Sequence, residues 1–278
     1  MVNIVGLGKF SCDVADNFSS NTQYSTYKID FDLPKSKKSR GLTLHQNPEK
    51  IEEKCPSMSY FLKQARGESH FFLEGRDPSS AASLKILEGM DHKRTNVFYI
   101  HPEEMDLNGN IGKNENVAFH VLQEYSRSGL FKNLFIFKTD DIEKAIGEIS
   151  LINYYGILKD TISSTVQLVD FFSNTTPVAE TRSDDNPTDC IGTYGIVDIE
   201  KQQEKLFFPL KEISRKHYYY GINSEKLKSD GSLIKKIRNQ VNSLKGEGTI
   251  ATYSVHETTY EEPQVIVVAK TNKIQERK

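Results

Sequence analysis

The sequence predicts an α/β protein with three parts: a parallel, Rossmann-like sheet domain over residues 1–148, a central core helix over 149–173, and an α+β domain over 174–270. Three observations predict this arrangement. Short apolar strands alternate with helical segments in the first half, as in parallel sheets covered by helices. The middle stretch is apolar on nearly every side, and the second half is rich in strands with one amphipathic helix. We expect residues 271–278 to form a loose, charged tail.

Length and composition exclude several classes of protein. A chain of 278 residues suits two modest domains, and 36 Lys and Arg against 38 Asp and Glu give no strong field for nucleic acid or an anionic membrane. No apolar run reaches the ~18 residues of a membrane span. Three scattered cysteines, Cys12, Cys55 and Cys190, do not form a disulfide or zinc pattern, and the histidines lack metal-ligand spacing. We therefore expect a reducing, cytoplasmic location and no metal site.

The first half reads as strands and helices in alternation. The expected strands are 2–5, 24–31, 70–73, 96–100 and 134–137. A first helix is expected to begin near residue 14, and a second covers 51–65 with a break at Pro56. The remaining expected helices are 81–90, 114–129 and 140–146. Residues 33–48 carry Pro, Gly and many charges, which indicates a long surface loop. Ligands of such a sheet bind beyond the carboxyl ends of its strands.

The central stretch, residues 149–172, has the period of an α-helix. One apolar face is formed by Leu151, Tyr155, Leu158, Ile162, Val166 and Val169, and further apolar positions are Ile152, Ile157, Leu168 and Phe171. A helix that is apolar nearly all round is buried on several sides. We expect it to join two packed domains.

The second half begins with a polar segment, 173–190, which we expect to be a loop. The expected strands after it are 193–199, 217–222, 249–255 and 264–269. A helix starts at Asp230-Gly231-Ser232 and continues through a regular apolar stripe, which gives an α+β pattern.

Two turns follow strand ends and precede helix starts, where backbone N–H groups favour phosphate. They are Gly6–Cys12 and Gly75–Ser80, and Lys9 and Arg76 provide cations for an anion in either turn. A plain strand-to-helix connection explains the first turn as well. In the second, Asp77 before Pro78 is a good helix start by itself, and its carboxylate would compete with phosphate for the same N–H groups.

In their order along the chain, these pieces resemble the tubulin/FtsZ superfamily over nearly the whole length. The run IVGLGKFSCDVADNF at 4–18 is similar to that family's first phosphate loop, and Asn47-Pro48-Glu49 to its turn near the γ-phosphate. The run EGRDPSSA at 74–81 stands at the place of the glycine-rich signature loop, and ISLINYYGILKDTISSTVQ at 149–167 resembles the core helix. The resemblance implies a parallel sheet domain, a core helix, an α+β domain and head-to-tail self-association.

The resemblance also implies a site for GTP, with the phosphates between the two turns and the base near Tyr155 and Lys159. Its implied nucleotide-binding residues are Gly6, Gly8, Lys9, Ser11, Cys12, Asp13, Asn47, Gly75, Arg76, Ser79, Ser80, Tyr155 and Lys159. The family hydrolyses GTP with acidic residues that a neighbouring subunit inserts from a loop after the core helix. Asp184, Asp185 and Asp189 are the candidates for that role here.

The sequence departs from the family at these places. The signature loop keeps one glycine and gains a proline and Asp77, side chains that prevent the backbone conformations glycine would use. The family's base-reading position, usually Asn or Asp, falls on Lys159, and the acidic loop lacks its spacing and helix. We therefore expect weak or altered purine-nucleotide binding and little hydrolysis, although the family as a whole has GTPase activity.

Three hypotheses follow for function. The first is a filament-forming, tubulin-like protein with altered nucleotide use. The second is a structural or partner-binding protein on the same fold without nucleotide chemistry. The third is an NAD-type dinucleotide enzyme, because Gly6-x-Gly8-x-x-Ser11 with Asp30 or Asp32 further on resembles that fingerprint, although its third glycine is missing. Such divergence of the loops would suit a viral or plasmid-borne relative.

Overall fold

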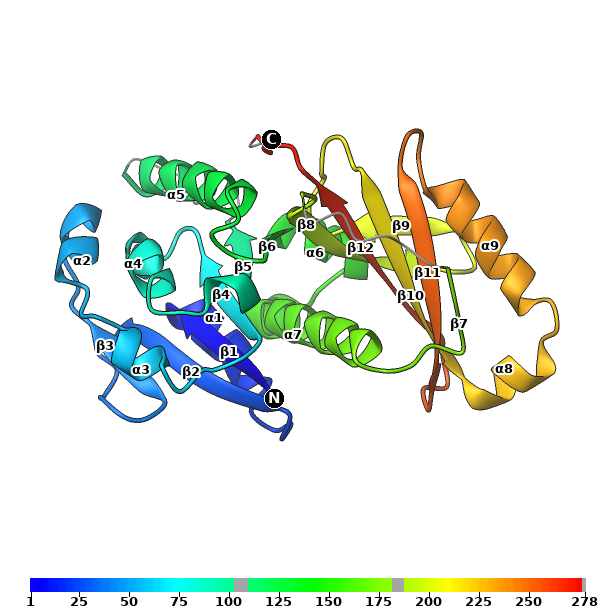
Figure 1. The fold of residues 1–278 in the computed structure, drawn as a ribbon, viewed down its shortest axis with the longest axis horizontal. Coiled ribbons are helices and arrows are strands. Elements are labelled where there is room, and N and C mark those ends of the chain that lie inside the picture. The colour runs from blue at the N-terminus through cyan, green and yellow to red at the C-terminus, as the bar shows by residue number, and fades with distance from the viewer. Residues whose placement is uncertain (103–109, 182–187, 277–278) are drawn as a thin grey trace.

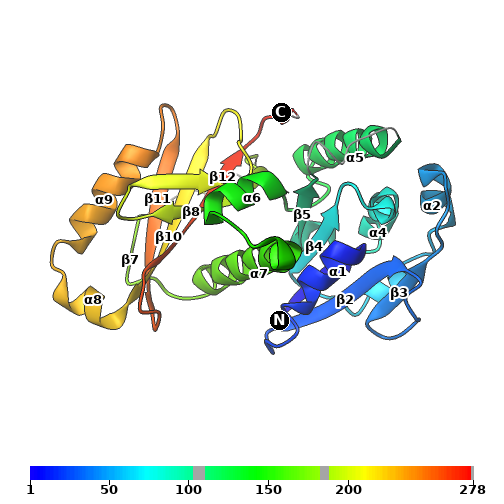
Figure 2. The same cartoon turned by 180° about the vertical axis from the view of Figure 1, so that it is seen from behind.

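A computed structural model describes residues 1–102, 110–181 and 188–276 of the chain. Within these ranges the backbone forms one sheet of 12 strands, and helices cover both of its faces in the first half (Figure 1). The strand order is β3-β2-β1-β4-β5-β6-β8-β12-β10-β11-β7, with β9 paired to β8. The helix α7 (Tyr154–Ser173) lies between the two halves in both views (Figures 1 and 2). The predicted α/β class is confirmed.

The first half is a parallel sheet, as predicted. Its strands are β1 (Val2–Leu7), β2 (Tyr24–Phe31), β3 (Ser39–Leu42), β4 (Ser69–Glu74), β5 (Thr95–His101) and β6 (Asn133–Lys138). Every neighbouring pair among them is parallel, and β4 and β5 are buried along their whole length. Strands buried on both faces need helices on both sides.

The helices of the first half fall into two layers. One layer packs on one face of the sheet and contains α2 (Pro48–Lys54), α3 (Ser59–Leu62), α4 (Ser83–Leu87) and α5 (Asn110–Arg127). The other face is covered by α1 (Lys9–Asp16), α6 (Thr139–Ile146) and α7. Two short 3₁₀ turns, η1 (Pro78–Ala82) and η2 (His92–Arg94), complete the connections.

The second half is a mixed sheet with helices on one face. Its elements are β7 (Ala179–Glu180), β8 (Ile191–Asp198), β9 (Gln203–Leu206), β10 (Arg215–Asn223), α8 (Ser224–Ser229), α9 (Leu233–Leu244), β11 (Ile250–Thr258) and β12 (Gln264–Thr271). Strand β10 is parallel to β11 and antiparallel to β12. The two halves meet where β6 pairs with β8, so the sheet is continuous and the division into parts at 148 and 174 stays a prediction.

The central helix is less buried than the sequence pattern predicted. Its buried apolar residues are Leu158, Ile162, Val166, Val169 and Phe172. Leu151 and Ile152 precede it in a 3₁₀ turn, η4 (Leu151–Asn153), and are 89% and 98% exposed. Tyr155 and Phe171 are about half exposed. The expectation that these four residues would belong to buried faces was wrong, because α7 packs on one face of the sheet and leaves its other side open.

Three short strands and the chain end also differ from expectation. The predicted loops contain β3 and β7, and β9 was not foreseen. Residues 271–276 are not a loose tail. Gln275 is 1% exposed, its backbone N–H donates to Gln123 Oε1 at 2.6 Å, and Ile274 packs against the first core. Arg277 and Lys278 lie outside the described residues.

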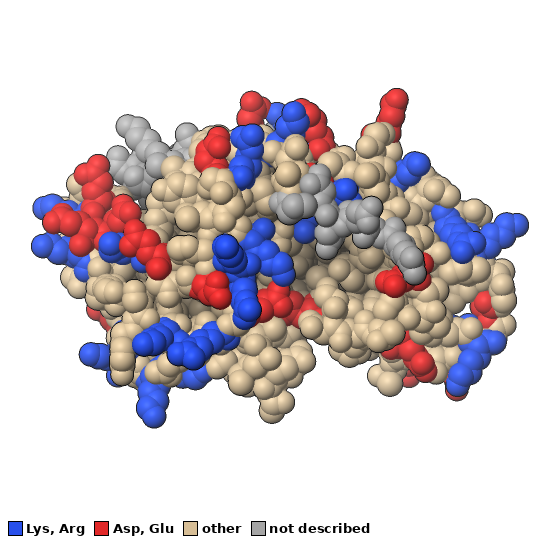
Figure 3. Space-filling model, viewed as in Figure 1, with Lys and Arg blue, Asp and Glu red and all other residues tan. Residues whose placement is uncertain are grey.

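Charged side chains of both signs lie in small groups on the face shown in Figure 3, separated by uncharged surface. No helix within the described residues is long and apolar enough to cross a membrane.

Candidate functional site

The candidate site is a cavity of about 570 Å³ at the carboxyl edge of the parallel strands, which we call the edge cleft. Its walls come from the start of α1, the turn after β4 and the start of α7. The lining residues are Lys9, Phe10, Asp13, Glu74, Arg76, Asp77, Pro78, Tyr155 and Lys159. Five of the predicted binding residues therefore meet in one place: Lys9, Asp13, Arg76, Tyr155 and Lys159. Strand ends of a parallel sheet share one edge, which is why residues distant in sequence converge there.

A second, smaller cavity of about 240 Å³ shares Arg76, Asp77 and Pro78 with the edge cleft. Gly75 and Ser80 also line it, together with residues at the start of α2. The segment 76–78 therefore contributes to both cavities. Asn47, also a predicted binding residue, does not line this cavity and caps α2: its Oδ1 accepts the N–H of Glu49 at 2.9 Å.

Asp77 lies against the backbone of both turns. Its Oδ2 accepts the N–H of Lys9 at 3.2 Å, at the start of α1, and its Oδ1 accepts the N–H of Ser79 at 2.9 Å, at the start of η1. Gly8 allows this contact because it has φ +80°, and a Cβ there would stand 2.5 Å from Asp77 Cγ. A carboxylate thus occupies the place at which the sequence predicted a phosphate.

The cations of the edge cleft are mostly paired within the chain. Arg76 Nε lies 2.8 Å from Glu74 Oε1, and its guanidinium lies over the ring of Tyr155 at 5.6 Å from the centroid. Lys159 Nζ lies 2.9 Å from Asp13 Oδ2. Three cations and three carboxylates line the cleft, so its formal charge is zero. An anionic ligand would therefore have to displace existing ion pairs.

Several predicted residues are buried behind the cleft instead of lining it. The Cys12 thiol donates to the carbonyl of Gly6 at 3.3 Å, and burial raises its pKa to about 12. Ser80 Oγ donates to the carbonyl of Gly75 at 3.4 Å. Each of these bonds lies within one turn and stabilises its conformation. The hydroxyls of Ser11 and Ser79 are buried and have no hydrogen-bond partner within the described part of the chain.

Of the three acidic candidates after α7, Asp189 is the one that the structure describes. Asp184 and Asp185 lie outside the described residues. Asp189 is 3% exposed, and its Oδ2 lies 2.9 Å from Nε of Arg215 on β10. This carboxylate serves an internal ion pair, so we interpret it as structural.

Sequence reasoning did not place Phe10, Glu74 or Pro78 in the site. Phe10 and Pro78 lie inside the two turns, and Glu74 directly precedes the second, so a candidate set made of both turns and their neighbours would have included all three. Asp77 was recognised as a competitor of phosphate, but its bond to Lys9 was not foreseen because it joins residues 68 positions apart.

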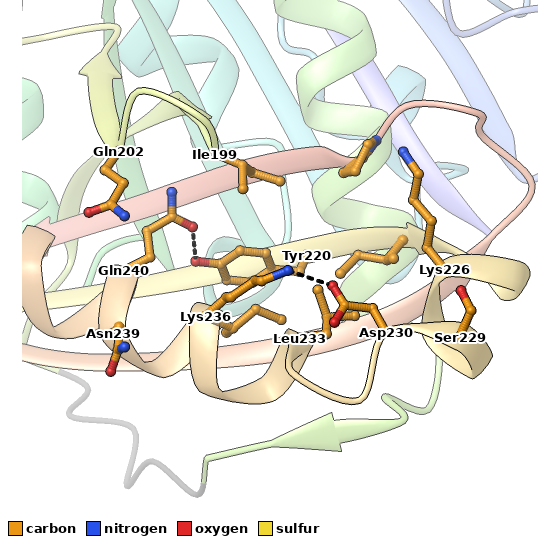
Figure 4. Close-up of a pocket in the computed structure, with 13 residues that line it drawn as sticks. Ile199, Gln202, Tyr220, Lys226, Ser229, Asp230, Leu233, Lys236, Asn239 and Gln240 are labelled. Atoms are coloured by element: carbon orange, nitrogen blue, oxygen red, sulfur yellow. Dashed lines mark hydrogen bonds and ion pairs between the residues drawn. The ribbon is translucent and has the colours of Figure 1, made fainter.

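A further cavity of about 470 Å³ lies in the second half, between α8, α9 and β10 (Figure 4). Tyr220, Leu233 and Ile237 contribute apolar surface to it. Tyr220 Oη donates to Gln240 Oε1 at 2.8 Å, and at the rim Lys236 pairs with Asp230 at 2.8 Å. The sequence had predicted no site here. No group of three His, Cys, Asp or Glu side chains within the described ranges could hold a metal ion.

The strand order of the first half and the helix between two differently built halves define a fold that several solved structures share. FtsZ from M. jannaschii (an empty dimer) matches with a TM-score of 0.70 over 97% of this chain and 88% of its own, at 11% identity. CetZ from Methanosaeta thermophila matches with a TM-score of 0.67 over 98% and 86%, at 12% identity. TubZ from Bacillus thuringiensis serovar israelensis, in a GTPγS-form protofilament, matches with a TM-score of 0.66 over 98% and 86%, at 13% identity.

The chain therefore has the fold of the tubulin/FtsZ superfamily, as the sequence predicted. No family model matches the sequence, and no curated protein matches it. At 11–13% identity the similarity establishes the fold.

Proposed function

We propose that the protein is a self-associating structural subunit of the tubulin/FtsZ type, that it binds GTP or another purine nucleotide at most weakly, and that it hydrolyses little of it. The fold supports self-association, because similar chains include TubZ solved as protofilaments and as a two-stranded filament. Fold alone does not assign function, so the part of the proposal that concerns nucleotide binding and hydrolysis is argued from the edge cleft.

The observation that supports weak nucleotide binding is the charge balance of the edge cleft. A nucleoside triphosphate needs cations or free N–H groups around its phosphates. Here Arg76 and Lys159 each hold a carboxylate, and the cleft as a whole has no net charge. The half-exposed ring of Tyr155 offers a surface for a base, but the guanidinium of Arg76 already lies over it. Weak binding follows from both features.

Turnover of GTP requires stabilisation of charge that develops on the phosphate. Asp77 would repel that charge, and Asp189 is engaged with Arg215. We therefore propose that association does not depend on hydrolysis. These contacts equally favour the variant of the proposal in which no nucleotide binds and the protein serves as a structural component. The three buried, unpaired cysteines fit the reducing, cytoplasmic location that forms part of this proposal.

The dinucleotide enzyme is the weaker candidate. The Oδ1 of Asp30, which would have to bind a ribose, accepts the N–H of Phe31 at 2.7 Å, and Ser11 at the third glycine position is buried. A shift of the melting temperature by NAD, and none by GTP, would favour this candidate over the proposal.

An exposed apolar surface beside the edge cleft supports association at this end of the molecule. Leu151 and Ile152 are almost fully exposed, and Tyr155 on the next turn lines the cleft. Adjacent exposed apolar side chains are typical of protein interfaces. In a head-to-tail assembly the neighbouring subunit would cover them.

Sedimentation velocity over a range of protein concentrations tests the proposal. We expect the sedimentation coefficient of the wild type to rise with concentration, with or without GTP. Ile152→Lys should abolish the rise, and Tyr60→Lys, which replaces an exposed apolar residue on α3 outside this surface, should retain it. A wild-type protein that stays monomeric at every concentration, in both conditions, would contradict the proposal.

A further inference from the structure

We infer that the carboxylate of Asp77 takes the place of a phosphate group at the start of α1 and thereby makes the edge cleft reject anions that its backbone would otherwise bind. The inference concerns which ligands the edge cleft can bind, and it rests on the proposed function, in which nucleotides bind weakly or not at all. Its physical basis is the set of contacts around Gly8.

The start of α1 is suited to an anion. The helix begins at Lys9, and its first N–H groups have no partner within the helix, so together with the helix dipole they favour negative charge. Gly8 at φ +80° brings the backbone close to whatever lies above it. Asp77 Oδ2 is the group that accepts the N–H of Lys9.

Capping of η1 alone does not account for the position of Asp77. A capping carboxylate needs one oxygen for the N–H two residues on, and Oδ1 serves Ser79 in this way. The second oxygen reaches a different helix start, 68 residues away in sequence. One carboxylate thus bridges both phosphate-facing turns, as the oxygens of a bound phosphate would.

Unpartnered hydroxyls point to a larger anion than a carboxylate. Ser79 is fully buried, its Oγ has no partner within the described residues, and it lies 2.6 Å from the position that a Cβ on Gly8 would take. Asp77 Oδ2 lies at the same 2.6 Å from that position. Ser11, in the first turn of α1, has a second buried hydroxyl for which the described part of the chain offers no hydrogen-bond partner. A phosphate has more acceptor oxygens than a carboxylate and could accept from Ser79 as well as from the backbone.

Removal of Asp77 should therefore open an anion site. The formal charge of the lining changes from zero to +1, and the N–H of Lys9 becomes available. A unit charge in direct contact with a ligand anion changes affinity by about tenfold or more, even with strong screening. Asp77→Gly also creates space, whereas Asp77→Asn keeps the shape and can still cap η1 through its amide oxygen.

The test is a calorimetric titration of the full chain with inorganic pyrophosphate, with melting temperature as a second readout. The variants are Asp77→Gly and Asp77→Asn, and the matched control is Asp13→Asn, which removes the same charge from the same cleft but not from the two turns. We expect both Asp77 variants to bind pyrophosphate at least tenfold more tightly than the wild type. The control should gain clearly less, because Asp13 does not contact the backbone of the two turns.

Three results would overturn the inference: wild-type binding as tight as that of the Asp77 variants, folded Asp77 variants without a gain, or an equal gain in Asp13→Asn. Because the titration reports the heat of ligand binding and not the size of the assembly, its outcome does not require self-association. A gain of binding in a protein that never associates would leave the inference intact and reject the proposed function.

Discussion

Ile162 on α7 offers a direct test of how the central helix is held. Its side chain is fully buried in the core that α1, α6 and α7 share with one face of the sheet. Ile152, in the 3₁₀ turn just before the same helix, is 98% exposed. Truncation of these two isoleucines removes the same atoms from opposite environments.

The expected costs differ severalfold. Ile162→Ala removes buried carbons and leaves a cavity, for which about 2–5 kcal/mol is typical. A cost near 3 kcal/mol is a large share of a total stability of about 5–15 kcal/mol and corresponds to a fall in Tm of roughly 6–12 °C for a chain of this size. Ile152→Ala should change the stability by less than about 0.5 kcal/mol.

Urea unfolding, followed by far-ultraviolet circular dichroism and by tyrosine fluorescence, measures both costs, because the chain has no Trp and 13 Tyr. Unchanged m-values would show that the two variants unfold to the same extent as the wild type. A cost below about 1 kcal/mol for Ile162→Ala, or equal costs for the two variants, would refute the packing of α7 described above.

Three further predictions concern single residues. Asp189→Ala should destabilise the fold by about 1.5–3 kcal/mol, because it removes a charge-assisted hydrogen bond between a buried carboxylate and the arginine on β10, and should leave GTP turnover at background in a phosphate-release assay; a stable variant, or turnover lost on substitution, would reject the structural role. Burial lowers the pKa of His70, but the Asp170 carboxylate outweighs it and raises that pKa, so the stabilisation is complete below about pH 6.5 and is lost as the pH rises through the raised value. The difference in unfolding free energy between wild type and His70→Asn should therefore shrink as the pH rises, and a difference that grows would contradict the ion pair. Gly8→Ala should cost more stability than Gly67→Ala, since both have positive φ but only Gly8 has Asp77 within 3 Å of a new Cβ; equal losses in thermal unfolding would refute the contact.

Most strands were predictable because their apolar runs are long and bounded by turn residues. The exceptions are short or polar. Strand β9 reads QEKL, which has no alternation of apolar and polar residues, and it forms because β8 offers an edge next to it. The exposure of Leu151 and Ile152 was also invisible in the sequence, since periodicity does not tell a core from an interface.

The candidate site was predictable to the level of the sheet edge. Lys9, Arg76 and Lys159 could be placed there because strand ends and the start of the central helix meet at one edge. Whether a side chain points into the cleft was not predictable. Ser11 and Cys12 face inward because the first turn of α1 packs on the sheet, and the ion pair between Lys159 and Asp13 joins residues far apart in the chain.

Electron microscopy of nucleotide-free protein tests the central claim most directly. The protein would be treated with a phosphatase to remove bound nucleotides and imaged at the highest concentration at which it stays in solution. The account predicts protofilaments one subunit wide without GTP, with the same subunit repeat when GTP is added. Isolated particles in the absence of nucleotide, and protofilaments only after GTP is added, would contradict it.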